Sequence, residues 1–464
     1  MKKKILGPTF EEMLHPEKIN PEIRQQARKA RDEDPLDPIN LFNITWRDHE
    51  NQIYYFVMPK ELTGVDANII VLYAREFPTG SHKVGATYSI LMEKTIRNEV
   101  DPSFHTLVWP STGNYGIGGA WVSSRMKFDS IVILPEEMSK ERFDIIREYG
   151  SRAIPTPGCE SNVKEIYDKA RELKASDPEK VRVLNQFSEF GNYRFHYYVT
   201  GNTILELIDE LKIGNNRVSA MVSAVGSAGT IAAGDRIKQV FPETKNVTVE
   251  PIQCPTLALN GYGGHDIQGI GDKHVTWIHN VLNNDAVIAV DDLQSKKMLQ
   301  VFTEDVGVNF LGELTQSPLL QLFKRVMGIS GVANIIASIK TARHFKMTKD
   351  DNIITVATDG IDRYHSVMKQ LTRDNGPLDR AEAKHRFEQI FLGAASDWIF
   401  EGTVENRQRW HNLKYYTWVE QQGKSVEELD LQRSRSFWEN EQTVVKETDE
   451  LLLEYRDKIQ HETP

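Results

Sequence analysis

The alternation of two kinds of segment restricts the fold of this chain more than any other feature of its sequence. Short apolar runs rich in β-branched residues recur along the chain, and longer amphipathic or charged stretches separate them. Such alternation is typical of an α/β protein with mostly parallel sheets flanked by helices, in which ligands bind in loops at the carboxyl ends of the strands. We expect strands at 53–57, 68–73, 106–109, 130–134, 219–223, 247–250, 286–290 and 352–357, and helices at 84–96, 140–149, 163–175 and 331–342.

The two ends of the chain lack this alternation. Residues 1–38 are polar and charged, with a surface helix expected at 21–31, so we interpret them as an extension outside the core. After residue 375 the pattern becomes helical and charged, and it contains Trp398, Trp410, Trp418 and Trp438. We expect this tail to be a helical appendage that packs either on the body of the protein or on a second subunit.

Composition excludes several classes of protein. Hydrophobic residues make up 40% of the chain and charged residues 26%, as in globular proteins, and no apolar run is long enough to cross a membrane. The first residues lack the apolar stretch of a secretory signal, so we expect a cytoplasmic protein. A net charge of -10 disfavours binding to nucleic acid. Cys159 and Cys254 lack the spacing of a disulfide framework or a zinc site, so we expect ordinary buried thiols and no metal.

Lys83 occupies a position that can support lysine chemistry. It follows the expected strand at 68–73 and the breaking segment 78–81, and it directly precedes a helix. The start of that helix offers free backbone N–H groups to an anion, and its positive end, together with partial burial, would lower the pKa of the lysine. A lysine that forms a Schiff base must lose its proton, so this setting is suitable. Taken alone, the stretch also fits a solvated lysine at the start of a helix.

Two further loops follow strands and open helices. In the first, 109–119, the side chains of Ser111, Thr112 and Asn114 can converge on a carboxylate or phenolate, although a capped helix start explains the same pattern. In the second, 224–234, small residues let the backbone approach a phosphate, and the hydroxyls of Ser227 and Thr230 can add donors. This second loop does not match the standard nucleotide-binding motifs.

Together these stretches resemble the fold-type II family of pyridoxal-phosphate enzymes, most closely its cysteine synthase branch, from about residue 68 to 364. The resemblance implies that pyridoxal 5'-phosphate is the cofactor and that Lys83 is the Schiff-base lysine. It also implies that the loop from Ser111 to Asn114 holds the carboxylate of an amino-acid substrate, while Asn114 contacts the phenolic oxygen of the cofactor. Further implied contacts are Gly226, Ser227, Ala228, Gly229 and Thr230 for the phosphate, Ser330 for the pyridine nitrogen, and Thr112, Gly113, Gln186 and Gly269 for the substrate.

Some positions depart from the cysteine synthase pattern. The stretch ending in His82 and Lys83 is more similar to the signature of the tryptophan synthase β type, which implies that His82 could donate to the phosphate. Tyr115 stands where cysteine synthases usually have threonine. Ala228 replaces a glycine, so we expect that this position does not need a positive φ. Asp359 is a second candidate for the pyridine nitrogen, although we expect it to hold water or the loop instead.

The resemblance implies β-replacement on an amino acid with a β leaving group, such as O-acetylserine with sulfide or a thiol, through an aminoacrylate intermediate. Lys83 would act as the general base, and a hydroxyl at Ser330 would leave the ring nitrogen unprotonated, which suits elimination better than transamination. One alternative is a β-elimination lyase of the cysteine desulfhydrase or serine/threonine dehydratase type. Another is a catalytically silent protein that binds a partner through its tail. A homodimer is expected from the family.

The resemblance also divides the chain into four parts and leaves one group of residues without a role. His265, His274 and His279 lie close in sequence to Asp266 and Asp272, but their spacing fits no common metal site, so we expect solvated loop residues. The four parts are an N-terminal extension and the start of the large domain (1–67), a region with the Schiff-base lysine and the smaller substrate-binding domain (68–205), a larger domain with the phosphate loop (206–372) and a helical C-terminal extension (373–464).

Overall fold

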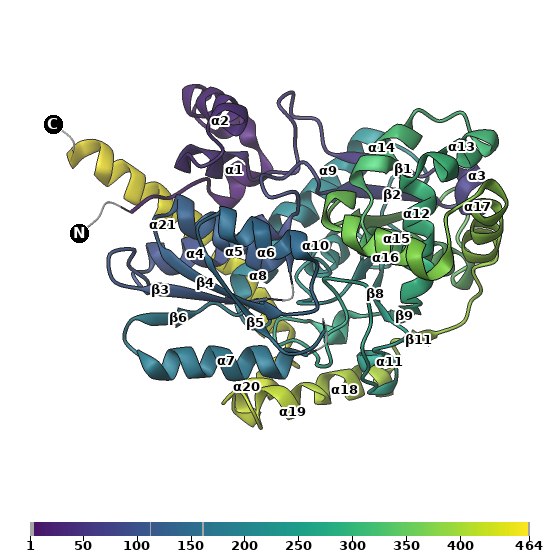
Figure 1. The fold of residues 1–464 in the computed structure, drawn as a ribbon. Helices are drawn as coiled ribbons and strands as arrows, with labels where there is room; N and C mark the ends of the chain where they lie inside the picture. The colour runs from purple at the N-terminus through teal and green to yellow at the C-terminus, as the bar shows by residue number, and fades with distance from the viewer. Residues whose placement is uncertain (1–3, 112, 160–161, 463–464) are drawn as a thin grey trace.

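Over residues 4–111, 113–159 and 162–462, which the computed structural model describes, the chain forms two β-sheets (Figure 1). Within these residues the larger sheet has the strand order β1-β2-β10-β7-β8-β9-β11 and the smaller has the order β5-β4-β3-β6. Neighbouring strands are parallel except at the two edges of the larger sheet. The strands are β1 (Tyr55–Val57), β2 (Asn68–Tyr73), β3 (Thr106–Pro110), β4 (Asp129–Pro135), β5 (Arg152–Thr156), β6 (Val181–Val183), β7 (Ala220–Ala224), β8 (Lys245–Pro251), β9 (Ala286–Val290), β10 (Asn352–Ala357) and β11 (Ile399–Glu401).

Helices cover the sheets, so the expected α/β class is confirmed. In Figure 1 α5 and α6 lie on one side of the smaller sheet and α7 lies on the other. Helix α15 packs against β10, β7, β8 and β9 of the larger sheet. The helices of the body are α3 (Lys60–Thr63), α4 (Lys83–Ile96), α5 (Asn114–Arg125), α6 (Lys140–Glu148), α7 (Val163–Ser176), α8 (Phe190–Arg194), α9 (Gly201–Leu211), α10 (Ala232–Val240), α11 (Thr256–Leu259), α12 (Asp292–Thr303), α13 (Asp305–Leu314), α14 (Leu319–Val326), α15 (Ile329–His344) and α16 (His365–Asn375).

The expected strands and helices are confirmed, with ends that differ by no more than about two residues, as is usual for element boundaries. Strands β2, β9 and β10 have the expected bounds because they lie inside the larger sheet, where both faces are buried and the residues are mainly apolar and β-branched. The unpredicted strands β5, β6 and β11 are all edge strands. Strands β6 and β11 span only three residues, and all three strands contain a charged residue, so none shows a continuous apolar run.

The N-terminal segment is part of the core, which corrects the interpretation of residues 1–38 as an extension outside it. Helix α2 (Pro21–Glu33) is the expected surface helix, with Ala27 as its buried residue. Before it, α1 (Phe10–Leu14) buries Phe10, Met13 and Leu14 in the same hydrophobic cluster as strands β2 and β3. The sequence pattern does not reveal these residues, because two glutamates separate Phe10 from Met13 and the helix spans little more than one turn.

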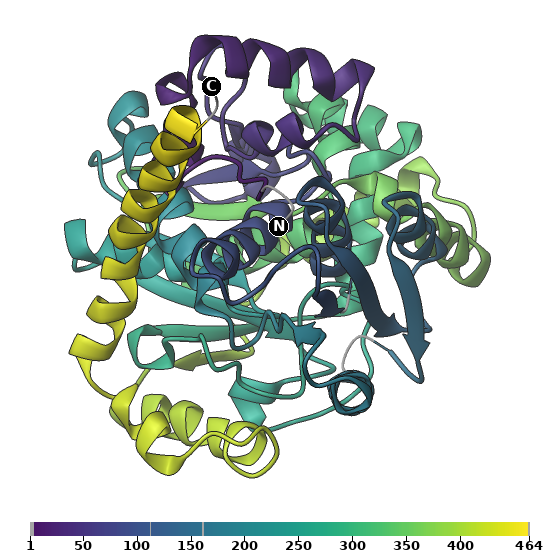
Figure 2. The same ribbon diagram turned by 90° about the vertical axis from the view of Figure 1, so that its left-hand side faces the viewer.

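The C-terminal segment packs on the body of the same chain, which is one of the two arrangements expected. Its helices run beneath the body and then along one side, where the long α21 reaches the N-terminal helices (Figure 2). Trp410, Trp418 and Trp438 are all buried. The helices are α17 (Arg380–Phe387), α18 (Val404–Asn412), α19 (Lys414–Trp418), α20 (Val426–Leu431) and α21 (Arg435–Glu462).

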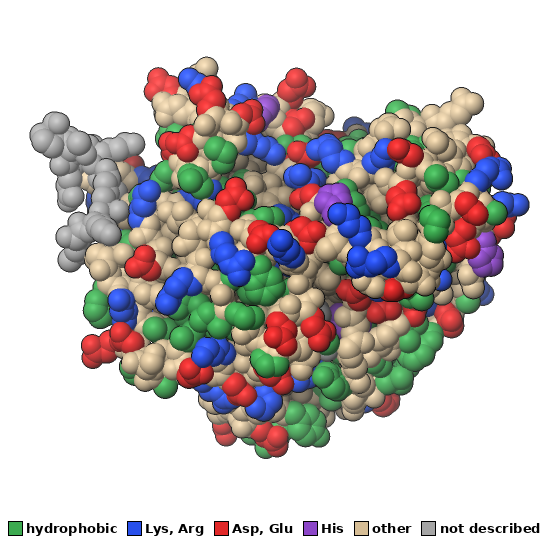
Figure 3. Space-filling model, viewed as in Figure 1, with side chains coloured by type: hydrophobic (Ala, Val, Ile, Leu, Met, Phe, Trp, Pro, Cys, Tyr) green, Lys and Arg blue, Asp and Glu red, His purple; other side chains and the backbone are tan. Residues whose placement is uncertain are grey.

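The surface carries both signs of charge. On the face in Figure 3 the Lys and Arg side chains are interspersed with Asp and Glu. Among the helices of the described ranges, none combines the length and the apolar character needed to cross a bilayer.

Candidate active site

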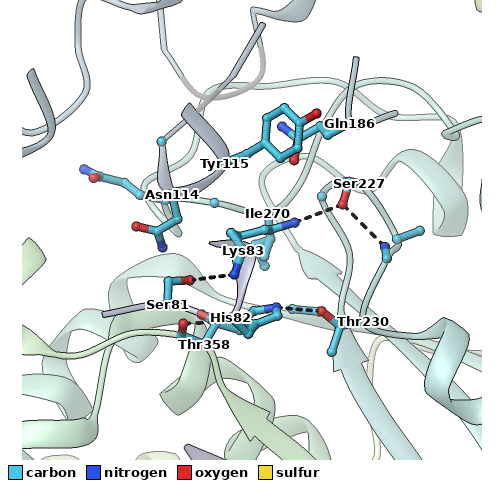
Figure 4. Close-up of a pocket in the computed structure, with 17 residues that line it drawn as sticks. Ser81, His82, Lys83, Asn114, Tyr115, Gln186, Ser227, Thr230, Ile270 and Thr358 are labelled. Carbon is cyan, nitrogen blue, oxygen red and sulfur yellow. Dashed lines mark hydrogen bonds between the residues drawn. The ribbon is translucent and has the colours of Figure 1, made fainter. Parts of the chain in front are cut away.

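The carboxyl ends of β2, β10 and β7 meet around Lys83. These strands are parallel neighbours in the larger sheet, so the loops that follow them lie at one edge. Lys83 is the first residue of α4, and its Nζ donates to Ser227 Oγ at 2.9 Å (Figure 4). A pocket opens between these loops, and its lining consists of Ser81, His82, Lys83, Gly113, Asn114, Tyr115, Gln186, Ala224, Gly226, Ser227, Ala228, Gly229, Thr230, Gln268, Gly269, Ile270 and Thr358.

The loop after β7 leaves no room for side chains at its glycines. A Cβ at Gly226 would lie 2.7 Å from the carbonyl oxygen of Gly269, and a Cβ at Gly229 would lie 2.1 Å from Asn192 Oδ1. Helix α10 begins directly after this loop, so its free N–H groups add a partial positive charge. The loop therefore exposes backbone to the pocket at a helix start, which is a common arrangement for binding phosphate.

Ala228, within this loop, has a φ of 62°, so the expectation that this position needs no positive φ was wrong. Alanine pays a steric penalty in the left-handed region that glycine does not. The turn imposes this conformation on the chain, and an alanine in the sequence does not reveal it.

We expect Ala228→Gly to be neutral or to raise the free energy of unfolding by up to about 1 kcal/mol, because relief of left-handed strain outweighs the greater freedom of glycine in the unfolded chain. Chemical denaturation would measure the change. Ala337→Gly, inside α15, is the matched control, and its free energy of unfolding should fall by at least about 0.5–1 kcal/mol. A similar loss in both variants would contradict the prediction.

His82 is buried and neutral. Burial, with a smaller contribution from the charge of Lys83, lowers the pKa of His82 to about 3. Its Nε2 lies 2.9 Å from Thr230 Oγ1 and its Nδ1 lies 3.4 Å from the carbonyl oxygen of Thr358. Because a carbonyl can only accept, the second contact puts the ring proton on Nδ1, and Nε2 then accepts from Thr230. His82 thus reaches the phosphate loop through Thr230, and donation to a phosphate would require the other tautomer.

The loop before α5 is tightly held. Ser111 Oγ accepts from the backbone N–H groups of Gly113 at 2.9 Å and Gly116 at 2.7 Å, so this hydroxyl caps the loop. Gly113 and Asn114 line the pocket, whereas Thr112 lies outside the described residues. The Oδ1 atom of Asn114 is buried and has no hydrogen-bond partner within the described part of the chain. A polar atom of this kind, on the wall of a pocket, is available to a ligand.

Asp359 holds the Asn114 loop, as expected. Its Oδ2 accepts from Asn114 Nδ2 at 2.6 Å and from the Tyr364 hydroxyl at 2.7 Å. Burial raises the pKa of Asp359, and the positive charge of Arg142 opposes that effect. Arg142, on α6, donates to Gln268 Oε1 and lies over the Tyr364 ring, so the network joins the segments that follow β3, β4, β8 and β10.

The residues expected at the ring nitrogen and at the substrate lie at or beside the pocket. Ser330 Oγ is 2.7 Å from Thr358 Oγ1, and Thr358 is the member of this pair in the pocket lining. Gln186 and Gly269 both line the pocket. Gly269 has a φ of 101°, a conformation that favours glycine.

Comparison with known proteins assigns the family. The sequence profile described as "Pyridoxal-phosphate dependent enzyme" matches residues 62–312. The chain belongs to this family. As a pyridoxal-phosphate-dependent enzyme of the cysteine synthase type, it has the cofactor implied by its sequence.

Several relatives of this pyridoxal-phosphate-dependent enzyme are cysteine synthases. It is 27% identical over 310 residues to a cysteine synthase of Staphylococcus aureus, which covers 65% of this chain and 90% of that protein. It is 30% identical over 290 residues to cysteine synthase B of Campylobacter jejuni, and this match covers 62% of this chain and 87% of that protein. The structure of a hydrogen sulfide-producing enzyme from Fusobacterium nucleatum matches with 25% identity and a TM-score of 0.56, and the match covers 69% of this chain and 88% of that one. The cysteine synthase of Entamoeba histolytica shares the fold, with a TM-score of 0.61 and 22% identity, and the match covers 73% of this chain and 92% of that one.

The residues of the pocket fit pyridoxal phosphate. The side-chain-free backbone at Gly226 and Gly229, next to the start of α10, suits the phosphate. The amine of Lys83, hydrogen-bonded to this same loop, suits the aldehyde. The buried Oδ1 of Asn114 and the hydroxyl of Thr358 offer polar contacts to the ring. These groups come from different loops, yet all of them line or face one pocket.

The group of histidines after β8 is buried, which corrects the expectation of solvated loop residues. His265 bonds to the carbonyl of Gly271, His274 to the Tyr167 hydroxyl and His279 to Asn284. Asp272 is also buried, and its Oδ1 has no hydrogen-bond partner in the described ranges. Burial raises the pKa of Asp272 to about 7, while Lys83 acts in the opposite direction. Over the same ranges, no group of three or more His, Cys, Asp or Glu side chains is arranged to hold a metal ion. Of the two cysteines, Cys254 is buried as expected, whereas Cys159 is partly exposed, so the expectation of a buried thiol is wrong for Cys159.

We expect Asp272→Asn to stabilise the protein at neutral and higher pH. The folded protein holds the Asp272 proton up to about pH 7, whereas the unfolded chain releases it near 3.8, so the wild-type protein loses stability as pH rises through this window. Asparagine does not titrate, so the advantage of the variant should grow from about pH 4 and be complete above about pH 7. Denaturation at several pH values would measure it. Asp266→Asn, which removes a partly exposed partner of Lys296, should show no such gain.

Sequence reasoning missed several residues of the site. Thr358 lines the pocket and contacts Ser330, and its position directly after a predicted strand is the signal that could have identified it. Asn192 donates to both the Gln186 carbonyl and Ser227 Oγ at 3.0 Å, and nothing in its local sequence indicates this. The burial of Asp272 is not visible in its local sequence, because it depends on packing by distant segments.

Proposed function

We propose that this enzyme catalyses β-replacement on an O-activated serine such as O-acetylserine, with sulfide or a thiol as the incoming nucleophile. The observation that carries the proposal is the position of Lys83, whose amine contacts Ser227 in a pocket also lined by Asn114 and Gln186. The likeness to cysteine synthases supports the choice of chemistry.

Each residue of the pocket would have a distinct part in this reaction. Bound pyridoxal phosphate would supply an electron sink for breaking the bond between Cα and its hydrogen. Lys83 Nζ would remove the proton from the substrate Cα and return it later, as general base and then acid. The hydrogen bond to Ser227 would hold that amine beside the substrate. Gly113, Asn114 and Gln186 would hold the substrate carboxylate and so orient the Cα–H bond toward Lys83.

The second candidate is β-elimination, which releases sulfide from cysteine. It is supported by the likeness to a hydrogen sulfide-producing enzyme from Fusobacterium nucleatum at 25% identity. Both candidates use Lys83 in the same way, and they diverge only after the β substituent has departed. In β-replacement a sulfur nucleophile would then add at Cβ. In β-elimination the unsaturated product would be released and hydrolysed to pyruvate and ammonia.

One experiment separates the two. The holoenzyme is incubated with O-acetylserine, with and without sulfide, and cysteine and pyruvate are quantified; a third sample contains cysteine alone, and its sulfide release is measured. Cysteine formed only with both substrates supports β-replacement. Pyruvate in every sample, with sulfide released from cysteine, would reject it in favour of elimination.

The organisation of the chain is also part of the proposal. We propose the four-part division at residues 67, 205 and 372, a location in the cytoplasm and a homodimer, as expected from the family. Light scattering of the purified protein would test the dimer directly.

A further inference from the structure

The C-terminal helices contact one particular segment of the active-site region. We call this segment, Val275 to His279, the wall segment, and all of its residues are buried. It lies between the cofactor pocket and the tail, and its backbone carbonyls point to donors on the tail. The family profile ends at residue 312, so it does not cover the tail.

Lys414 makes several of these hydrogen bonds at once. It is fully buried, and its Nζ donates to the carbonyls of Trp277 at 3.0 Å and His279 at 2.7 Å and to Gln432 Oε1 at 2.5 Å. Burial lowers the pKa of Lys414 well below its usual value, so keeping this charge in the interior is costly. A buried lysine whose hydrogen bonds go to carbonyls fixes the path of the backbone that it contacts.

Two further tail residues hold the same segment. The indole of Trp418 donates to the carbonyl of Val275 at 2.8 Å and packs on the Trp277 ring at 5.9 Å. Gln432 Nε2 donates to the carbonyl of Trp277 at 3.1 Å, and the Trp438 indole in turn donates to the carbonyl of Gln432. We call the segment from Lys414 to Trp438 the C-terminal clamp.

The wall segment in turn holds the phosphate loop and the segment next to Gln186. The Thr276 hydroxyl donates to the carbonyl of Ser227 at 2.9 Å, and Ser227 Oγ accepts from Lys83 Nζ. The backbone N–H of Trp277 donates to the carbonyl of Phe187 at 2.9 Å, directly after Gln186. The contacts are therefore continuous from the tail to the phosphate loop and to the residue that follows Gln186.

We propose that the C-terminal clamp positions the cofactor loop through the wall segment, with Lys414, Trp418 and Thr276 as positioning residues. The clamp is more than an appendage, because its buried polar contacts converge on the carbonyls of one segment. This inference rests on the cofactor placement proposed above.

Two tryptophans provide a matched test. Trp418 and Trp410 are both buried, and both donate an indole N–H to a carbonyl, but the acceptor of Trp410 is Leu257 in α11, outside the wall segment. Trp418→Phe and Trp410→Phe each remove one such donor and leave a similar cavity. The dissociation constant of pyridoxal phosphate is measured by titration of the full-length apoprotein, and thermal unfolding without the cofactor is measured alongside.

Both variants should lose stability, whereas Trp418→Phe alone should raise the dissociation constant, by about 2- to 10-fold, the range given by one lost hydrogen bond. Thr276→Val, which removes a hydroxyl with little change of shape, should raise it to a similar extent. In the double variant of Thr276→Val and Trp418→Phe, the dissociation constant should rise by less than the product of the two single increases, because both changes interrupt one series of contacts. In the double variant of Thr276→Val and Trp410→Phe, the dissociation constant should rise by the full product of the two single increases.

Equal changes in cofactor affinity for Trp418→Phe and Trp410→Phe would overturn the inference, and so would full multiplication in the Trp418 and Thr276 double variant. Failure of the cofactor placement itself is distinguishable. In that case borohydride treatment of the holoenzyme would fix pyridoxal phosphate to a lysine other than Lys83, whatever the effect of the tryptophan variants.

Discussion

Replacing Lys83 with alanine should abolish activity and the covalent attachment of pyridoxal phosphate. The Lys83 amine lies in the pocket, 2.9 Å from Ser227 Oγ, and it is the only lysine in the pocket lining formed by the described residues. Loss of general acid–base catalysis alone costs about 10²- to 10⁴-fold in rate. Rate measurements and mass spectrometry after borohydride treatment would show the effect, with label on Lys83 in the parent and on no residue in the variant.

Two further variants make this test specific. Lys83→Arg keeps a positive charge beside Ser227 but offers no amine for attachment, so it should be as inactive as the alanine variant. Lys273→Ala removes a lysine that lies over the Tyr262 ring and should remain active and labelled. Turnover near the parent rate in either Lys83 variant would refute the assignment.

Gly229→Ala should have the second largest effect, on cofactor affinity. Its Cβ would lie 2.1 Å from Asn192 Oδ1, and Asn192 is fully buried. To admit the methyl group, Asn192 must give up its hydrogen bonds to the Gln186 carbonyl and to Ser227 Oγ, or the phosphate loop must move. Overpacking costs about 1–3 kcal/mol, which is about 5- to 150-fold in affinity if binding requires the native loop. Titration of the apoprotein with pyridoxal phosphate would measure the loss.

Gly312→Ala is the matched control for this substitution. Gly312 lies inside α13, and its Cβ would meet Leu320 Cδ1 at 3.8 Å, an ordinary contact. Alanine is the better helix former by up to about 1 kcal/mol, so this variant should be as stable as the parent or more so and should bind the cofactor unchanged. If Gly229→Ala bound the cofactor equally well, the loop would not be a tight cradle for the phosphate.

The positions of Lys83 and of the main strands could be predicted because local patterns determine them. Strands β2 and β10 are largely buried on both faces, so each reads as a mainly apolar run rich in β-branched residues. The break at 78–81 then places Lys83 at the start of a helix. Spacing of this kind does not depend on distant parts of the chain.

Other features depend on contacts between distant segments and could not be predicted. The φ of Ala228 is set by the turn that joins β7 to α10, and an alanine gives no sign of it. His274 and Asp272 have polar sequence neighbours, yet they are buried by loops and by the tail. The same holds for Phe10, whose apolar contacts come from residues far along the chain.

The two ends of the chain also stabilise one another. Asp449 on α21 accepts hydrogen bonds from the backbone N–H groups of Phe10 and Glu11, and Arg456 donates to Glu12 and to the carbonyl of Gly7. During synthesis on the ribosome, α1 therefore emerges long before the carboxylate that binds its first turn. Helix α1 can therefore make its native contacts only after translation has passed residue 456, more than 400 residues later.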